Sequence, residues 1–593
     1  MKQFFLTIAG VFAGLMLFFV VLPILLIVSV AASASSDTGV PARSVLEIDL
    51  RQGLTDQAPT NPFAALGGGG LSVLNIVETL DQAEDDDRIK AVLIRLPEMG
   101  MSPAAADELR QAVDRFEASG KPIVAHSQGL YPIGASVSTY MLGASAGELW
   151  MSSTAQLGAT GLSIDEFFLG RAFDRYGVQP EFEQRYEFKN AVNTFTQSDY
   201  TEAHRQAQTA WMSSIYNASI AAAAVGREME APALRAALES GPHSAEEARQ
   251  LGLIDQIGEA EAVEASLLER AGDNAEILEF HEYASAVGER AGSGSDAIAI
   301  VGGEGAIVTG RTSADPFGGG SMIASDDTAE AIYDAIKDDA VKAIVFRVSS
   351  PGGSPEASEQ ILTAVRAAKA ANKPVVVSMG DYAASGGYWI SAEASAIVAQ
   401  PSTLTGSIGV FGGKFVFDEA LARFGVDMRH IAVGGPYADA FSVDQPFTDA
   451  QRQAFSGNMD AIYAQFLTRV STGRDMTRDQ VHEVARGRVW TGAQARRLGL
   501  VDEIGGLFEA VARAKQLAGI DADADVRFKR FPKPQSAFEA LSEVFGVSGE
   551  AARALVAIGA VTRDPDAQAV LSRIRTERAR AGGASVLADQ PLG

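Results

Sequence analysis

Apolar and polar segments alternate along most of the chain in the order that is typical of parallel α/β proteins. Residues 343–348 form a short run of mostly apolar and β-branched residues, as expected of a buried strand. Residues 358–371 then show helical spacing and are rich in alanine, and residues 375–377 form the next apolar run. This order predicts an α/β fold with largely parallel sheets and helices packed outside them.

The first 36 residues have a different pattern. No charged residue occurs from Gln3 to Ser36, and residues 4–32 are almost wholly apolar, enough for a helix that crosses a hydrocarbon core of ~30 Å. A cleaved signal peptide is the alternative, because residues 32–34 resemble a small-residue cleavage site, but its apolar region is usually about 7–15 residues long. We therefore predict an uncleaved transmembrane anchor, with Lys2 on the cytoplasmic side and the bulk of the chain outside the cytoplasm.

The rest of the chain contains an internal duplication. Five short segments of the first half recur in the same order in the second half, at an offset that stays between 247 and 252 residues. Their pairs are 86–87 with 338–339, 90–96 with 342–348, 121–124 with 373–376, 175–178 with 423–426, and 248–255 with 495–502. A period of this length predicts two homologous domains rather than a solenoid, whose units are ~20–50 residues long.

These observations divide the chain into four parts. We predict an anchor at 1–36, an N-terminal repeat at 37–290, a C-terminal repeat at 296–520, and a helical or flexible tail at 521–593. The Gly- and Ser-rich residues 291–295 form the expected linker. In the tail, residues 538–560 have the pattern of amphipathic helices, and no catalytic motif is visible there.

Composition narrows the classes of function. Of the 593 residues, 47% are hydrophobic and 21% are charged, which is typical of globular domains. The net charge of −26 argues against a nucleic-acid partner, since such binding needs basic groups. The absence of cysteine excludes disulfides, thiolate nucleophiles and Cys-ligated metals, and the six histidines show no metal-binding spacing, so we expect neither a metal nor a cofactor.

Two glycine-rich turns are the candidates for catalysis. Ser385 lies in residues 380–388, where an apolar run passes into a helix-like stretch, and a helix N-terminus there would favour developing negative charge. The turn 350–354 follows the preceding run, so both turns are expected at the same edge of a parallel sheet, where the N–H groups of Gly353 and Gly386 would form an oxyanion hole. The alternative is a pair of ordinary packing turns. A base for Ser385 is left open by this reasoning: no histidine lies in a glycine-rich motif, and a lysine would serve only if burial lowered its pKa.

Together these motifs resemble signal peptide peptidase A in its long (67K-type), duplicated, membrane-anchored form. The resemblance implies two tandem ClpP/crotonase-like repeats and a Ser–Lys dyad, with Ser385 as nucleophile, Lys189 as general base and Ser407 orienting the lysine. The segment around Lys189 departs from the Gly-Lys-Tyr-Lys-Ser-Ala pattern of that family. The segments that carry the resemblance are 349–354, 380–391, 403–410 and the paired Leu-Gly-Leu-Ile/Val-Asp motifs.

Alignment of the two repeats provides a separate argument for one composite site. Without gaps, Lys189 falls opposite Tyr437, so the second repeat has no lysine at that position. Ser385 falls opposite Ile133 or Gly134, so the first repeat has no serine there. Each repeat thus has what the other lacks, as expected if one site forms between them.

These expectations combine into one functional hypothesis. The chain is predicted to be a membrane-anchored serine endopeptidase of the bacterial inner membrane, with its catalytic part on the periplasmic side, that degrades cleaved signal peptides and other unfolded or apolar peptides. By resemblance it is a homotetramer. The alternatives are a non-catalytic binding or scaffold protein of the same fold, and a crotonase-type acyl-CoA enzyme.

Overall fold

The structure is a computed structural model, and it describes residues 10, 39–58, 70–288, 294–312 and 321–532 of the chain. The predicted anchor, apart from residue 10, and most of the predicted tail lie outside these residues, as do residues 291–293 of the predicted linker. Within the described part, no helix is both long enough and apolar enough to cross a membrane.

The first repeat is built on a six-stranded sheet in which every pairing is parallel. The central strands are buried on both faces, which explains their nearly continuous apolar sequences. In spatial order the strands are β10 (Gln256–Ile257), β6 (Glu148–Met151), β5 (Ile123–Ser127), β4 (Ile89–Arg95), β1 (Ser44–Asp49) and β11 (Glu276–Glu279).

The second repeat has the same strand order. Its sheet runs β21 (Glu503–Ile504), β17 (Ala396–Ala399), β16 (Val375–Ala384), β15 (Val341–Ser350), β12 (Ala297–Glu304) and β22 (Arg527–Phe531), all parallel. The far end of β16 also pairs with β18 (Leu404–Gly406), which pairs antiparallel with β20 (Val489–Thr491). The predicted α/β class is confirmed. The last strand, β22, lies in the segment predicted as a tail, so the second sheet extends into it.

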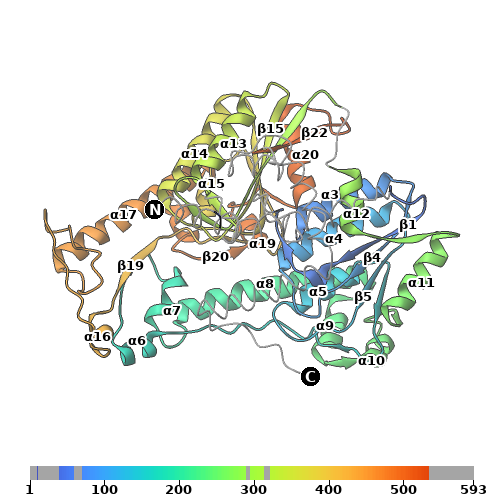
Figure 1. The fold of residues 1–593 in the computed structure, drawn as a ribbon, viewed down its shortest axis with the longest axis horizontal. Helices are drawn as coiled ribbons and strands as arrows, with labels where there is room; N and C mark the ends of the chain where they lie inside the picture. The colour runs from blue at the N-terminus through green and yellow to red at the C-terminus, as the bar shows by residue number, and fades with distance from the viewer. Residues whose placement is uncertain (1–9, 11–38, 59–69, 289–293, 313–320, 533–593) are drawn as a thin grey trace.

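Helices cover the sheets of both repeats (Figure 1). Those of the first repeat are α3 (Val73–Asp85), α4 (Pro103–Ala118), α5 (Ser136–Ala144), α6 (Gly170–Tyr176), α7 (Asn193–Thr196), α8 (Glu202–Gly226), α9 (Ala231–Glu239), α10 (Ala245–Gln250), α11 (Ala260–Ala271) and α12 (Phe280–Val287). Those of the second are α13 (Ser325–Lys337), α14 (Pro355–Ala370), α15 (Gly386–Ser391), α16 (Asp418–Ala422), α17 (Asp449–Gly473), α18 (Arg478–Val484), α19 (Gly492–Arg497) and α20 (Leu507–Ala518). The short elements are η2 (Leu50–Gln52), η4 (Asn190–Val192), β2 (Leu54–Thr55), β3 (Leu71–Ser72), β7 (Gln156–Leu157), β9 (His243–Ser244), β13 (Ala306–Val308) and β14 (Met322–Ala324).

Equivalent helices begin in the same way in the two repeats. In α4 and α14 the capping serines, Ser102 and Ser354, accept a hydrogen bond from the backbone N–H three residues on, and a proline takes the first helical position. Both features favour a helix start, because proline has no N–H to leave unpaired there. The duplication is therefore visible in local sequence as well as in topology.

A buried ion cluster joins the two repeats. Arg347 in β15 is 1% exposed, and its guanidinium pairs with Asp56 and Glu108 of the first repeat; Nη2 lies 2.7 Å from Glu108 Oε2. Beside it, Gln111 in α4 donates to Gln400 at 2.8 Å. Because buried charges are tolerated only when they are paired, these contacts hold the repeats in one relative orientation.

A two-stranded arm supplies the second junction. Strand β8 (Gln179–Gln184) of the first repeat pairs antiparallel with β19 (Phe411–Val416) of the second. Both strands extend toward α6 and α16, away from the sheets, at the left of Figure 1. The long helix α8 then returns from this arm and contacts α5 in one repeat and β20 in the other. This path carries the segment after β8 into the second repeat, where the candidate nucleophile lies.

Candidate active site

Ser385 stands at the turn between β16 and α15, as the sequence predicts. Its backbone has φ 54° and ψ −118°, a conformation that residues other than glycine rarely adopt. Its N–H donates to Gly406 O at 2.9 Å. Its carbonyl accepts the N–H groups of Tyr388 and Trp389, which starts the helix. Strain of this kind persists only where surrounding contacts impose it, and it is common at reactive residues.

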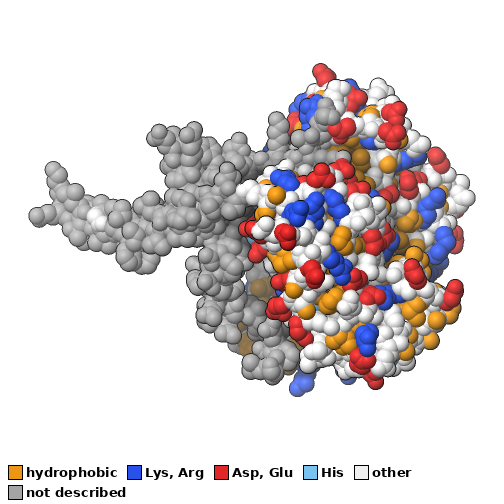
Figure 2. All heavy atoms as spheres, turned by 90° about the vertical axis from the view of Figure 1, so that its right-hand side faces the viewer, with side chains coloured by type: hydrophobic (Ala, Val, Ile, Leu, Met, Phe, Trp, Pro, Cys, Tyr) orange, Lys and Arg blue, Asp and Glu red, His pale blue; other side chains and the backbone are white. Residues whose placement is uncertain are grey.

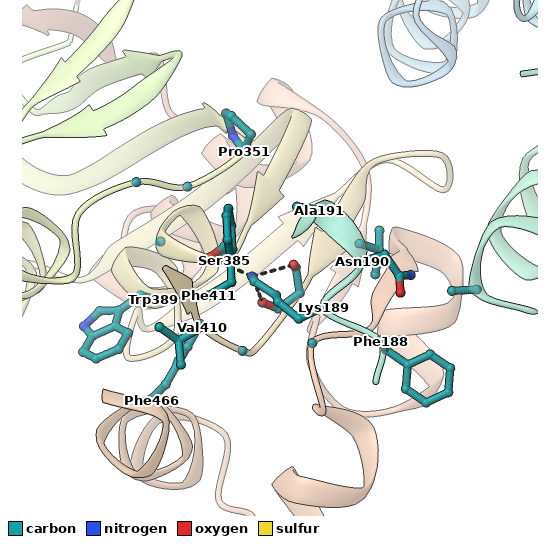
Figure 3. Close-up of a pocket in the computed structure, with 18 of the residues that line it drawn as sticks. Phe188, Lys189, Asn190, Ala191, Pro351, Ser385, Trp389, Val410, Phe411 and Phe466 are labelled. Atoms are coloured by element: carbon teal, nitrogen blue, oxygen red, sulfur yellow. Dashed lines mark hydrogen bonds between the residues drawn. The ribbon is translucent and has the colours of Figure 1, made fainter. Parts of the chain in front are cut away.

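Lys189 reaches this serine from the other repeat. Its Nζ lies 3.0 Å from Ser385 Oγ, 2.9 Å from Ser407 Oγ and 2.8 Å from Ser407 O (Figure 3). The structure thus brings together the two residues of the predicted dyad and Ser407, which the resemblance had assigned to orienting the lysine. Ser407 holds the amine at two points, and the third contact of the amine is directed at the serine hydroxyl.

The environment of Lys189 changes its acidity. The side chain is 4% exposed, and burial lowers the pKa of Lys189 to about 7, because the charged amine loses its water. Among the described residues, no carboxylate pairs with the amine. A lysine with this pKa is largely neutral slightly above neutrality and can accept a proton from a neighbouring hydroxyl.

Two glycines that the sequence analysis did not single out make this burial possible. Gly487 has φ 82°, and a Cβ there would lie 2.6 Å from the Cβ of Lys189. A Cβ on Gly409 would lie 3.2 Å from Cδ of the same lysine. The backbone of the second repeat therefore closes directly over the lysine. In the sequence, Gly487 is visible only as part of the Arg-Gly-Arg stretch 486–488 before β20. Nothing in that stretch indicates a contact with Lys189.

The residues that depart from the family pattern beside Lys189 dock onto the second repeat. The ring of Tyr186 lies 4.9 Å from that of Tyr463, Glu187 forms an ion pair with Arg486, and Phe188 lies 4.9 Å beneath the guanidinium of Arg488. These side chains replace the expected Gly-Lys-Tyr pattern with a different set of contacts that holds the same lysine in place.

The predicted oxyanion donors lie next to Ser385. Gly352 has φ 110°, and a Cβ there would lie 2.7 Å from Gly386 N, while a Cβ on Gly386 would lie 3.0 Å from Gly353 N. Hydrogen bonds from Ile307 N to Gly352 O and from Ser354 N to Ile307 O fix this turn. The N–H groups of Gly353 and Gly386 donate to no other described residue, so both are available to a developing oxyanion beside the serine.

A cavity of about 680 Å³ contains these groups. Trp389, Val410 and Phe466 form an apolar wall on one side of Ser385, and Pro351 lies above it (Figure 3). At the same cavity, one of the six histidines, His204, contributes to the lining; the sequence had given it no role. Among the described residues, no group of three or more His, Asp or Glu side chains is placed to hold a metal ion.

Matching tyrosines align the two repeats at this turn. Tyr388 donates its hydroxyl to Leu500 O at 2.8 Å, and Tyr140 donates to Leu253 O at 2.9 Å. Counting back three residues from each tyrosine places Val137 opposite Ser385, rather than Ile133 or Gly134. The first repeat therefore has Val137, which carries no hydroxyl, at the nucleophile position. The sequence alignment had placed Ile133 or Gly134 there.

Comparison with known proteins agrees with this geometry. The model of peptidase family S49 matches residues 115–273 and 367–521, and Protease 4 of Salmonella typhi is 32% identical over 80% of this chain and 79% of that protein. The chain belongs to peptidase family S49. Protease 4 of Haemophilus influenzae is 30% identical over 77% of this chain and 75% of its own length. The chloroplastic serine protease SPPA of Arabidopsis thaliana is 29% identical over 85% and 74%.

These matches confirm the predicted family, its tandem duplication and the serine protease class. A membrane-bound stomatin-specific protease of known structure covers 40% of this chain at 12% identity, with a TM-score of 0.24. Such a score is too low to test the finer expectation of a ClpP/crotonase-like fold, which stays a prediction.

Proposed function

We propose that this S49 peptidase cleaves peptide bonds with a Ser–Lys dyad shared between its two repeats. Neutral Lys189 takes the hydroxyl proton as Ser385 attacks the substrate carbonyl, and the N–H groups of Gly353 and Gly386 bind the oxyanion. The protonated lysine then gives its proton to the leaving amine. Water hydrolyses the acyl-enzyme with the lysine again as base, and Ser407 keeps the amine in line throughout.

The observation that carries the proposal is the 3.0 Å contact between Lys189 Nζ and Ser385 Oγ inside a buried site. A buried lysine with no carboxylate beside it costs folding stability. A non-catalytic scaffold gains nothing from this loss of stability, whereas a general base that acts near neutral pH needs the lowered pKa that burial produces. The contact therefore favours an enzyme over the scaffold alternative.

The walls of the cavity support the proposed substrate class. Trp389, Val410 and Phe466 beside the serine favour extended peptides with small or apolar side chains at the cleavage site. Signal peptides left in a membrane after cleavage have this character, so we propose them, together with other unfolded or apolar peptides, as substrates. An N-terminal anchor with the catalytic part on the periplasmic side of the bacterial inner membrane would hold the site near them.

Exposed apolar side chains in the segment that follows α16 support a homo-oligomer. Phe424, Ile431 and Val433 are 83%, 96% and 92% exposed in this chain. Apolar groups gathered in one segment at such exposure are typical of a subunit interface. Together with the resemblance, this favours a tetramer. On the opposite side, the face of the first repeat shows interspersed acidic and basic side chains, as on ordinary solvent-facing surfaces (Figure 2).

The proposal is tested by cleavage of a synthetic signal peptide with the full chain and two variants, Ser385→Ala and Lys189→Ala. Each variant is expected to lower kcat/KM by about 10³-fold or more, since both groups act on the same proton. Lys373→Ala is the matched control, because that amine is also held by backbone carbonyls but lies outside the cavity. Near-normal turnover of either dyad variant would overturn the assignment.

A further inference from the structure

The cavity that contains the dyad has a second, polar end. It is lined there by Glu166, from the irregular segment before α6, and by one face of α8. That face carries His204, Gln208 and Trp211, which lie on successive turns of the helix and so point the same way. The mechanism proposed above uses none of these side chains.

A chain of hydrogen bonds fixes the carboxylate of Glu166. Trp211 Nε1 donates to the amide oxygen of Gln208, so the amide nitrogen of Gln208 must face the other way, and it donates to Glu166 Oε1. His204 Nε2 lies 3.2 Å from Glu166 Oε2. Both carboxylate oxygens are thereby held in place, and each keeps lone pairs that can accept a further donor.

His204 does not neutralise this carboxylate. The ring is 4% exposed, and its other nitrogen, Nδ1, lies 3.5 Å from the amide nitrogen of Asn193, an arrangement that fits an unprotonated Nδ1. Burial also lowers the pKa of His204, with the charge of Glu166 opposing this shift. A neutral ring that donates from Nε2 satisfies both neighbours.

Within the part of the chain that the structure describes, no other cation compensates the charge of Glu166. Among the described residues, no lysine or arginine nitrogen lies within 4 Å of it. Arg205, the nearest basic residue along α8, instead pairs with Asp199 and lies over the ring of Tyr200. Of the described residues that line the cavity, Glu166 is the one carboxylate, and the dyad lysine is the one aliphatic amine. A fixed negative charge therefore faces the substrate space.

We propose that Glu166 forms a specificity subsite for a cationic group of the bound peptide. The ligand is an alkylammonium or guanidinium group, supplied by a lysine or arginine side chain or by a free N-terminus that reaches the polar end of the cavity. This inference rests on the proposed function, because it requires the peptide to be bound across the dyad. It predicts that the enzyme combines an apolar preference at the cleaved bond with a basic preference at a distance from it.

The test uses the full chain and a set of apolar peptides in which one residue at a time is lysine or its uncharged analogue norleucine. At one position, wild type is expected to prefer lysine by about tenfold in kcat/KM. This preference lies between those expected of a fully exposed and of a fully desolvated ion pair. Glu166→Gln removes the charge at nearly the same side-chain size and should reduce this ratio to about one. Glu166→Lys should make the lysine peptide the poorer substrate.

Controls separate the possible outcomes. Glu279→Gln also removes a carboxylate paired with a histidine, but outside the cavity, and should keep the wild-type ratio. N-acetylated peptides show whether a side chain or the free amino terminus is the ligand, because only in the second case should acetylation lower kcat/KM of wild type and leave that of Glu166→Gln unchanged. Equal ratios for wild type and Glu166→Gln at every position, together with an equal effect of acetylation on both enzymes, would overturn the subsite. Absence of Ser385-dependent cleavage of any peptide would instead overturn the proposed function.

Discussion

The protonation of Lys189 provides the most quantitative prediction. Because a general base must be neutral, kcat/KM should rise with pH through the pKa of about 7 and reach a plateau above it. Ser407→Asp perturbs this value directly. Its carboxylate would replace a hydroxyl that lies 2.9 Å from the lysine Nζ, and an opposite charge at that range favours the charged amine.

The size of the effect follows from the same distances. An opposite charge within 4–6 Å raises the pKa of a lysine by about 1–3 units, which places it at about 8–10 in the variant. At pH 7 about half of the wild-type lysine is neutral, whereas a pKa of 9 leaves about 1% neutral, so kcat/KM should fall by about 50-fold. Above pH 9 most of this loss should be recovered.

The assay is the pH dependence of peptide hydrolysis from pH 5 to 10. Ser407→Asn is the matched control, since it has nearly the same shape as aspartate and no charge. Both variants lose the hydroxyl that holds the lysine, so a drop common to both reports orientation alone. Only the aspartate variant should shift the inflexion upward. The same inflexion in both variants would refute lysine as the base.

Three further predictions concern stability and the oxyanion site. Arg347→Met should lower the free energy of unfolding, measured in urea, by about 3–5 kcal/mol, since it leaves two buried carboxylates without their cation. Arg311→Met is the control, because this exposed ion pair should contribute far less to stability, and similar losses in both variants would contradict the role of burial. Gly353→Ala places a Cβ 2.0 Å from Ile307 O and should lower kcat by about 10²–10³-fold; an unchanged kcat excludes this turn from catalysis. The pKa of Lys189 falls on folding, so between about pH 7 and 10 the unfolded chain binds a proton that the folded chain does not. In this range the free energy of unfolding of wild type relative to Lys189→Met should therefore rise by about 1.4 kcal/mol per pH unit. A difference that does not change with pH would mean that the lysine is not desolvated.

Local sequence was sufficient to predict the secondary structure of much of the second repeat. The apolar run that becomes β15, the alanine-rich stretch that becomes α14 and the turn at Ser385 all lie where their residue patterns place them. Buried parallel strands and capped helices carry strong local signals, and the duplication repeats each signal once. The strand order common to both sheets follows from that repetition.

The contacts between the repeats carried no local signal. Arg347 and Asp56 are 291 residues apart, and neither stands in a pattern that indicates the other. Gly487 closes over Lys189 from a segment that the sequence analysis did not consider. The specificity proposed for Glu166 depends on side chains of α8 that a sequence shows only as ordinary helix residues. A function can be assigned to such groups only once the structure shows that two distant segments line the same cavity.

The alignment of the repeats failed at one point for a related reason. The segment before α5 differs in length from the turn at Ser385, so matching residues one by one gave Ile133 or Gly134 as the counterpart. The hydrogen bond of Tyr140 to Leu253 O fixes the helix itself and moves the counterpart to Val137. The predicted complementarity of the repeats does not depend on this difference.

The most direct test of the shared dyad is covalent labelling of the full chain by a serine-directed acylating probe, with the adduct mapped by mass spectrometry. We predict one adduct on Ser385, with a labelling rate that rises through about pH 7 and falls by about 10²–10⁴-fold in Lys189→Met. An adduct on another residue, or a labelling rate of Ser385 that Lys189→Met leaves unchanged, would contradict it.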